Sequence, residues 1–421
     1  MGLLKTVLPL VLLMAFLPLK AQDEDYEYER SSLHTMMIKH LNHDFGDVIE
    51  DVYLSTPFPQ RFNDHNLGVR VVNFAEIEDD QQYNIEAFIK EVNLGQKMVA
   101  KWFDRDKETG SFDMDLVKKR GYYNATQSQR NVARADMKGL SLLEDAGELL
   151  IKRTFLVVND IDYVSKTGSK VHKKIKSSMR KDARKNAFKG SPFKLFSIKK
   201  QIKDANDLAN DWMKNNKELL DEQNKIGGFN VKITSYLFRL DWDDEKANEF
   251  YVRYYTEDGT TDKDKVEAFR NEKNLFGMTY VGKTSCESEE VESMSVDDPK
   301  AFMVKVCTRA LDKNIAQLQH AHPDFRIKAP LISVEPLTAH VGLKEDITED
   351  SRFEVLERVI DQDGKLSYKR VGVIKPEKGK IWDNRYEAEE DGGEDANLQF
   401  TTFRKVSGGD FYSGMLIRET D

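Results

Sequence analysis

The strongest constraint on the fold of this chain is a dense run of β-branched and aromatic residues at positions 154–164. A run of this kind predicts a β-strand. A compact apolar stretch at 69–74 predicts a second strand upstream, and stretches with helical spacing lie between the two. Because strands that alternate with helices favour an α/β layer with some parallel pairing, the sequence predicts a mixed sheet covered by helices.

Other patterns before residue 336 complete this α/β domain. We expect a short helix near 33–41 and an antiparallel hairpin formed by 229–242 and 249–255. Further helices are expected at 85–102, 127–152, 262–273 and 299–320, and a further strand at 276–285. The antiparallel hairpin makes the expected sheet mixed rather than doubly wound.

The pattern changes after residue 336. Two apolar runs, 353–360 and 366–374, flank an Asp363-Gly364 pair, which is a typical hairpin signal. Short strands are expected to follow at 380–383, 399–406 and 414–418, with no helical periodicity. We therefore expect a leader at 1–21, an acidic lead with a short helix at 22–60, an α/β domain at 61–336, and a β-rich barrel or sandwich at 337–421.

The first 21 residues are typical of a secretory signal peptide. Lys5 precedes an apolar run at 7–19, and Ala21 offers a small residue before Gln22. The apolar run is too short to cross a bilayer comfortably, and no later stretch approaches the ~20 apolar residues that a span requires. We expect a mature chain without a transmembrane segment, located in the periplasm or at the outer membrane.

Positive charge is concentrated in one segment. Residues 166–203 contain twelve lysines and two arginines against one aspartate, although the whole chain has a net charge of −9. Apolar residues at every fourth position from Val171 predict a helix that Gly190 and Pro192 end, and a second helical pattern follows. The segment 166–223 is therefore expected to be a helical hairpin inserted between two strands.

A basic amphipathic helix suits an anionic surface such as phospholipid or lipopolysaccharide headgroups. The expected contact residues are Lys170, Lys173, Lys174, Arg180, Lys181, Arg184 and Lys185. An alternative is a solvated helix whose apolar stripe packs on its own domain and whose charge neutralises the acidic remainder. Nucleic acid is not an expected partner, because the segment is poor in arginine and an exported protein meets little of it.

The two cysteines, Cys286 and Cys307, leave two alternatives. A disulfide between them would close a loop of about 20 residues and stabilise the fold by roughly 3 kcal/mol. Cys307 also lies on an apolar helical stripe with Val304 and Leu311, where a buried free thiol is equally natural. Two cysteines in a chain of this length exclude a disulfide-rich scaffold.

One segment matches a phosphate-binding loop. Residues 277–284 fit G-x-x-x-x-G-K-[ST] letter for letter. The four inner residues, 278–281, favour a strand, and the acidic residues after Thr284 would repel phosphate. We therefore expect no nucleotide at this position.

No metal site is expected either. Residues 104–115 have alternating acidic positions like a calcium loop, but Thr109 stands where glycine is needed and Asp115 where a bidentate glutamate is needed. Histidines occur in two close groups without the neighbouring ligands of a zinc site. These groups are His34, His40 and His43, and His320 and His322. The expectation is a protein without cofactor or metal.

Several stretches resemble uncharacterised exported proteins of Bacteroidetes-type bacteria. They are the Lys-Ala-Gln that ends the leader, residues 138–147, and the closing residues 408–418. The resemblance covers most of the chain and includes no catalytic motif. It implies export and no particular activity.

These observations predict an exported cell-envelope protein of non-enzymatic type. It would be a binding or assembly component that contacts an anionic surface or an envelope protein through the basic segment 166–203. The alternative is an exported hydrolase that acts on glycan or peptide through carboxylates. The sequence does not single these carboxylates out, since the chain has 73 acidic residues.

Overall fold

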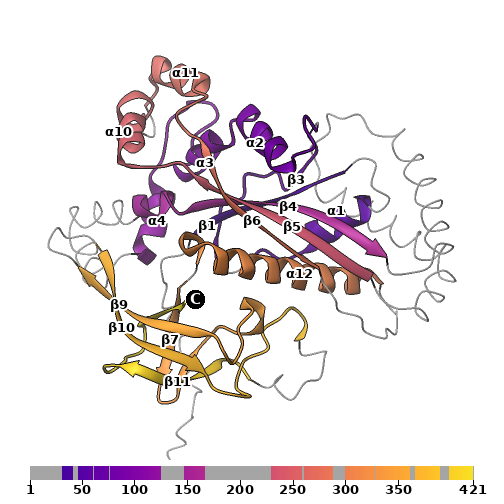
Figure 1. Ribbon diagram of the computed structural model, residues 1–421. Coiled ribbons are helices and arrows are strands. Elements are labelled where there is room, and N and C mark those ends of the chain that lie inside the picture. Colours follow the sequence, from indigo (N-terminus) through magenta and orange to yellow (C-terminus); the bar gives the residue numbers. More distant parts are fainter. Residues whose placement is uncertain are drawn as a thin grey trace, which may run out of the picture.

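The computed structural model describes residues 31–40, 46–59, 61–74, 76–124, 147–165, 229–257, 260–287, 299–326, 328–360, 366–388 and 398–420. These residues form a mixed sheet flanked by helices, followed by a closed antiparallel β-barrel (Figure 1). The expected fold class is confirmed, and the β-rich part is a barrel rather than a sandwich. Among the described residues, no helix is both long and apolar enough to cross a membrane.

The centre of the parallel part of the sheet is β1 (Ser32–Ile38). It pairs in parallel with β4 (Thr154–Ser165) on one side, and with the short strands β2 (Asn63–Asp64) and β3 (Val71–Val72) on the other. All seven residues of β1 are buried. The predicted helix at 33–41 is therefore wrong, because a strand covered on both faces shows the same unbroken apolar run as a short buried helix.

The antiparallel part of the sheet consists of β4, β5 (Phe229–Leu240) and β6 (Met278–Glu287), in that order. The strands predicted at 154–164 and 276–285 are confirmed. The predicted partner strand at 249–255 is wrong, because α10 (Asp244–Arg253) occupies most of it. The side chain of Asp243 accepts a hydrogen bond from the backbone amide of Lys246 at 2.8 Å and so caps this helix.

Helices cover both faces of the sheet. One face is covered by α2 (Gln81–Glu91), α3 (Leu94–Trp102), α4 (Asp115–Asn124), α10 and α11 (Lys263–Asn271), whose side chains share one core cluster with Met36 and Val158. The other face is covered by α1 (Gly46–Ser55) and α12 (Pro299–Ala321). The helices predicted at 262–273 and 299–320 are confirmed. The helix predicted at 85–102 is divided in two by Asn93, whose φ of 52° is left-handed.

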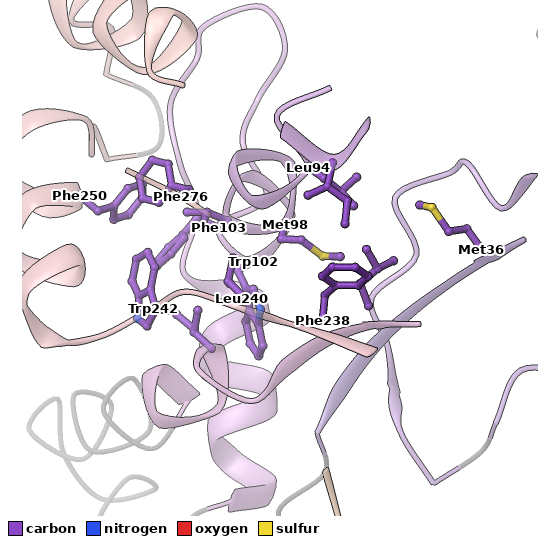
Figure 2. Close-up of a cluster of buried hydrophobic side chains, with 14 of the residues drawn as sticks. Met36, Leu94, Met98, Trp102, Phe103, Phe238, Leu240, Trp242, Phe250 and Phe276 are labelled. Atoms are coloured by element: carbon purple, nitrogen blue, oxygen red, sulfur yellow. The ribbon is translucent and has the colours of Figure 1, made fainter. Parts of the chain in front are cut away.

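The core on the α3 side is rich in aromatic side chains (Figure 2). The Phe103 ring lies 4.5 Å from the ring of Phe250 and 6.1 Å from that of Trp242, measured between centroids. Trp102 is fully buried, and its indole Nε1 donates to Thr154 Oγ1 at 2.8 Å. This cluster joins α3 to the strands and to α10 on one face of the sheet.

The barrel has the strand order β10-β11-β8-β7-β12-β9. The strands are β7 (Ala329–Val334), β8 (Leu337–Ala339), β9 (Arg352–Ile360), β10 (Leu366–Pro376), β11 (Thr401–Gly408) and β12 (Leu416–Thr420). The predicted hairpin of 353–360 with 366–374 is confirmed as β9 and β10. The strand predicted at 380–383 is reduced to a single bridge between Trp382 and Gly342.

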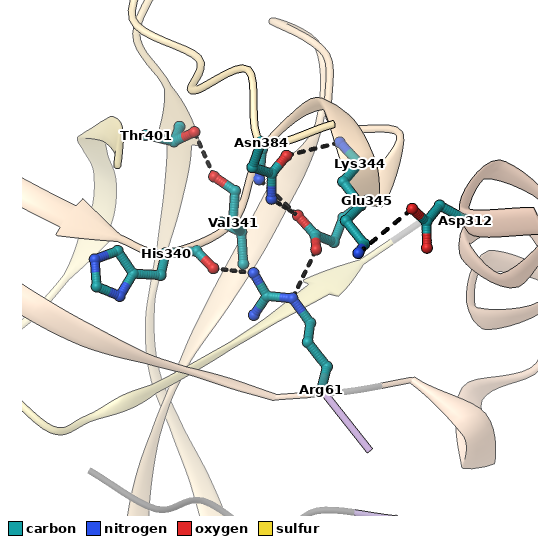
Figure 3. A network of polar contacts seen from close by, with 9 residues as sticks. Arg61, Asp312, His340, Val341, Lys344, Glu345, Asn384 and Thr401 are labelled. Carbon is teal, nitrogen blue, oxygen red and sulfur yellow. Dashed lines mark hydrogen bonds and ion pairs between the residues drawn. The ribbon is translucent and has the colours of Figure 1, made fainter. Parts of the chain in front are cut away.

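A polar network joins the barrel to the α/β domain (Figure 3). Arg61, which precedes β2, donates from Nε to Glu345 Oε1 at 2.6 Å and also bonds the carbonyl oxygen of His340. The second oxygen of Glu345 accepts from Asn384 Nδ2 at 2.8 Å. Of these residues, Arg61 belongs to the α/β domain, so its charge-assisted bond to Glu345 links the barrel to the sheet.

A second ion pair crosses the same joint. Asp312 Oδ2 on α12 lies 3.4 Å from Lys344 Nζ, and the two side chains are 11% and 27% exposed. Burial raises the pKa of Asp312 to about 6, and the charge of Lys344 opposes this rise only in part. The joint therefore contains a carboxylate whose ionised form is disfavoured.

Candidate functional site

The carboxyl ends of β1 and β3 lie at one edge of the sheet, where the helices that follow them diverge. α1 follows β1 and packs on the α12 face through Ile49 and Val52. α2 packs on the opposite face through Ile85 and Ile89. In open α/β sheets, ligands bind outside the carboxyl ends of strands at such a switch point. This edge is therefore the first candidate site in the α/β domain.

A histidine lies between two carboxylates at this edge. His40 comes directly after β1, and its Nε2 lies 2.7 Å from Asp160 Oδ1 on β4. Its Nδ1 lies 3.8 Å from Glu76 Oε1, in the segment after β3. Gln81 Nε2, at the start of α2, reaches the second oxygen of Asp160 at 3.5 Å. Four separate elements thus bring these side chains together.

The carboxylates change the acidity of the imidazole. The hydrogen bond with Asp160 raises the pKa of His40, burial opposes this rise, and the charges of Asp160, Glu76 and Asp162 add to it. A raised pKa keeps a larger share of the imidazole protonated near neutral pH. Such a group can give or take a proton from a bound substrate. Among the described residues, no group of three or more His, Cys, Asp or Glu side chains could hold a metal ion.

The same edge carries the ends of the long β4–β5 hairpin. β4 runs parallel to β1 and continues past Asp160 to Ser165, which pairs with Phe229. The residues that flank 166–228, Ser165 and Phe229, are therefore neighbours in a ladder that runs unbroken down to Phe155↔Arg239. The expected helical hairpin at 166–223 and all seven expected contact residues lie outside the described residues, as does the leader at 1–21. These residues are Lys170, Lys173, Lys174, Arg180, Lys181, Arg184 and Lys185.

Both cysteines are free thiols in the structure. Cys286 on β6 and Cys307 on α12 are buried in one apolar cluster, and Cys286 Sγ donates to the Ala310 carbonyl oxygen at 3.3 Å. Burial raises the pKa of Cys286 to about 11 and that of Cys307 to about 12. Of the two alternatives, the structure has the buried free thiol. Neither thiol has the lowered pKa of a reactive cysteine.

The segment that matches a phosphate loop is part of β6, as its inner residues predict. Gly282 lies against His322, since a Cβ there would come within 2.2 Å of the imidazole ring and the ring would have to move. In the segment that resembles a calcium loop, Asp106 Oδ1 accepts from the backbone amides of Glu108 and Thr109 at 2.8 and 2.6 Å. This carboxylate thus stabilises its own turn.

Sequence reasoning considered His40 only together with other histidines and did not find its partner. The available signal was the strand around Asp160, where two carboxylates, Asp160 and Asp162, interrupt an otherwise apolar run. Acidic residues are disfavoured within strands, and Asp160 pairs with Ile38, the last residue of β1, so its carboxylate lies where that strand ends. Compared with protein-family models and with curated proteins, the sequence matches none of them.

Proposed function

We propose that this chain is an exported cell-envelope protein of non-enzymatic type that docks on an anionic surface through its basic segment 166–203. The observation that supports this proposal is the pairing of Ser165 with Phe229. The stretch 166–228, which contains the basic segment, connects two residues of one strand pair, so it is an insertion between β4 and β5. The described ladder runs from this pair to Phe155↔Arg239 without using any residue of the insertion.

The charge distribution determines which part of the protein would face the anionic surface. The basic segment has a net charge of +13, which leaves −22 on the other residues of the chain. Each basic residue close to an anionic membrane surface contributes about 1 kcal/mol to binding, and this contribution falls off within a Debye length. An anionic surface therefore attracts the segment and repels the acidic body. The leader at 1–21 supports a location in the periplasm or at the outer membrane, where such surfaces are available.

Replacing the seven expected contact residues by glutamine tests this proposal. The residues are Lys170, Lys173, Lys174, Arg180, Lys181, Arg184 and Lys185. We expect the affinity for vesicles that contain anionic lipid to fall about 100-fold or more, because half of the basic charge of the segment is lost. Vesicle co-sedimentation at low and high salt measures this change, with zwitterionic vesicles as the background.

A matched control variant carries the same change of charge elsewhere. It replaces seven exposed lysines of the body by glutamine, namely Lys97, Lys101, Lys107, Lys119, Lys263, Lys273 and Lys378. This variant is expected to bind anionic vesicles far more tightly than the segment variant does, because the segment keeps its charge and only the repulsion of the body increases. Equal loss of binding in both variants would show that net charge, and not the segment, determines docking. Retention of binding in both would contradict the proposal.

A second candidate function rests on His40 and its two carboxylates. An imidazole bonded to Asp160 at the carboxyl edge of a sheet is an arrangement for proton transfer in hydrolysis of a glycan or peptide. With chromogenic glycan and peptide substrates, Asp160→Asn would be expected to lower turnover by about 100-fold or more. Absence of turnover in the wild type, or equal turnover in the variant, would contradict this candidate.

A further inference from the structure

A pocket of about 430 Å³ lies where the end of α12 meets the barrel. His320 comes from the last turn of α12, and Glu419 and Thr420 come from β12. The rest of the lining belongs to residues 346–352, the turn that leads from η2 (Leu343–Glu345) into β9. Both domains thus contribute to one concave surface, which is a common location for ligand pockets.

The wall between the two domains is fixed by hydrogen bonds. His320 Nε2 lies 2.8 Å from Glu419 Oε2. Arg326 ties the same two residues together, because it donates to the His320 carbonyl oxygen at 2.6 Å and to the Glu419 carbonyl oxygen at 3.3 Å. The hydrogen bond with Glu419 also raises the pKa of His320. The side of the pocket formed by His320 and Glu419 is therefore preorganised.

The lining determines what kind of ligand can bind. It contains three carboxylates, those of Asp346, Asp350 and Glu419, against the guanidinium of Arg352 and the imidazole of His320, and it contains no apolar side chain. Within the described part of the chain, no side chain donates to the carboxylates of Asp346 or Asp350. These two groups can each accept hydrogen bonds from a ligand, and a positively charged donor forms the strongest ones.

The hydroxyl groups of the pocket add donors for a carbonyl. Thr348 Oγ1 accepts from the amide of Asp350 at 3.3 Å, and Ser351 Oγ accepts from the amide of Thr348 at 3.1 Å. Each hydroxyl keeps its own proton, which can be donated to a ligand carbonyl oxygen. An organic cation attached to peptide carbonyls matches both sets of groups. The described residues offer no group of three ligands for a metal ion, so an inorganic cation does not match.

We propose that this pocket binds the arginine or lysine side chain of a peptide segment, with the cationic group at Asp346 and Asp350. The proposal does not depend on docking by the basic segment 166–203, because the pocket consists of described residues at the other end of the scaffold. α12 ends there beside Phe155, at the start of β4, whereas the segment leaves from Ser165 at its end. Failure of one proposal leaves the other intact.

Calorimetric titration of the full mature chain with acetyl-Gly-Arg-Gly-amide tests this site. The matched control ligand is the same peptide with citrulline, which has nearly the same shape without the charge. We expect the arginine peptide to bind at least about tenfold more tightly than the citrulline peptide at low salt. No detectable binding of the arginine peptide, or equal binding of both peptides, would overturn the proposal.

Two variants locate the binding on the protein. Asp346 has a φ of 57°, a left-handed conformation that asparagine also tolerates, so Asp346→Asn removes the charge without straining the turn. The double variant Asp346→Asn with Asp350→Asn is expected to weaken binding of the arginine peptide about tenfold or more. Asp410→Asn, an exposed carboxylate of the barrel outside the pocket, is expected to leave binding unchanged. Equal affinity of the double variant and the wild type would overturn the assignment.

A third ligand separates peptides from other organic cations. Spermidine carries amines without peptide carbonyls, so it is expected to bind more weakly than the arginine peptide. Tighter binding of spermidine, with the same sensitivity to the double variant, would make this a polyamine site and overturn the peptide assignment. Cleavage of the peptide during titration would give the carboxylates a catalytic role and overturn a site for binding alone.

Discussion

The Gly95→Ala variant is expected to lose on the order of 3 kcal/mol of unfolding free energy, the largest single-residue effect on stability that we expect. A Cβ at this position of α3 would lie 2.2 Å from the carbonyl oxygen and 2.8 Å from the carbonyl carbon of Phe276. Both atoms belong to the backbone. The steric clash can therefore be relieved only if α3 moves away from Phe276 and from β6, the strand that begins two residues later. In an unconstrained helix the same change would stabilise by about 1 kcal/mol.

Urea unfolding followed by tryptophan fluorescence measures this loss, since Trp102 on the same helix is fully buried. The matched control is Gly409→Ala, because a Cβ there meets no atom within 4 Å. The control is expected to change stability by less than about 0.5 kcal/mol. A Gly95→Ala protein as stable as the wild type would mean that α3 does not approach Phe276 this closely.

The Asp312→Asn variant is expected to gain stability relative to the wild type as the pH rises. The folded chain raises the pKa of Asp312 to about 6, so the folded state binds this proton more tightly than the unfolded state does. The stabilising contribution of protonated Asp312 to the free energy of unfolding is therefore complete below about pH 4. It declines as the pH rises through 6. Because the pKa rises by about two, ionisation of Asp312 lowers the free energy of unfolding of the wild type by at most about 3 kcal/mol at neutral pH.

Asparagine does not titrate, so the difference in unfolding free energy between variant and wild type isolates this group. We expect the difference to move in favour of Asp312→Asn by up to about 3 kcal/mol between pH 4 and pH 7.5. Asp324, which is 71% exposed and pairs with Arg239, supplies the control variant Asp324→Asn. The difference in unfolding free energy between Asp324→Asn and the wild type is expected to change by less than about 0.5 kcal/mol over the same pH range. A flat difference for Asp312→Asn would show that Asp312 is solvated and that the joint is open.

The parts of the fold that sequence patterns predict correctly are those with local signals. The Asp363-Gly364 pair between two alternating runs identifies the β9–β10 hairpin, and the apolar stripe through Cys307 identifies α12. β1 is mistaken for a helix because its burial on both faces comes from helices elsewhere in the chain. α10 is mistaken for a strand because the aromatic residues around Phe250 serve a tertiary cluster rather than a sheet.

The candidate sites also differ in whether a local sequence signal identifies them. The basic segment is visible in composition alone, because charge density needs no tertiary structure. The contact between His40 and Asp160 joins residues 120 positions apart, and the pocket needs α12 and the barrel to be docked. The contacts that dock the two domains include the ion pair of Arg61 with Glu345, which are 284 positions apart. No local pattern encodes such pairs.

The most direct test of the central claim is to remove the basic insertion without touching the scaffold. Residues 166–228 are replaced by Asn-Gly, which closes Ser165 and Phe229 as a two-residue hairpin. We predict a protein that unfolds within a few degrees of the wild type and no longer pellets with anionic vesicles at low salt. A folded protein that still pellets to the wild-type extent would contradict the claim that this insertion is the docking element.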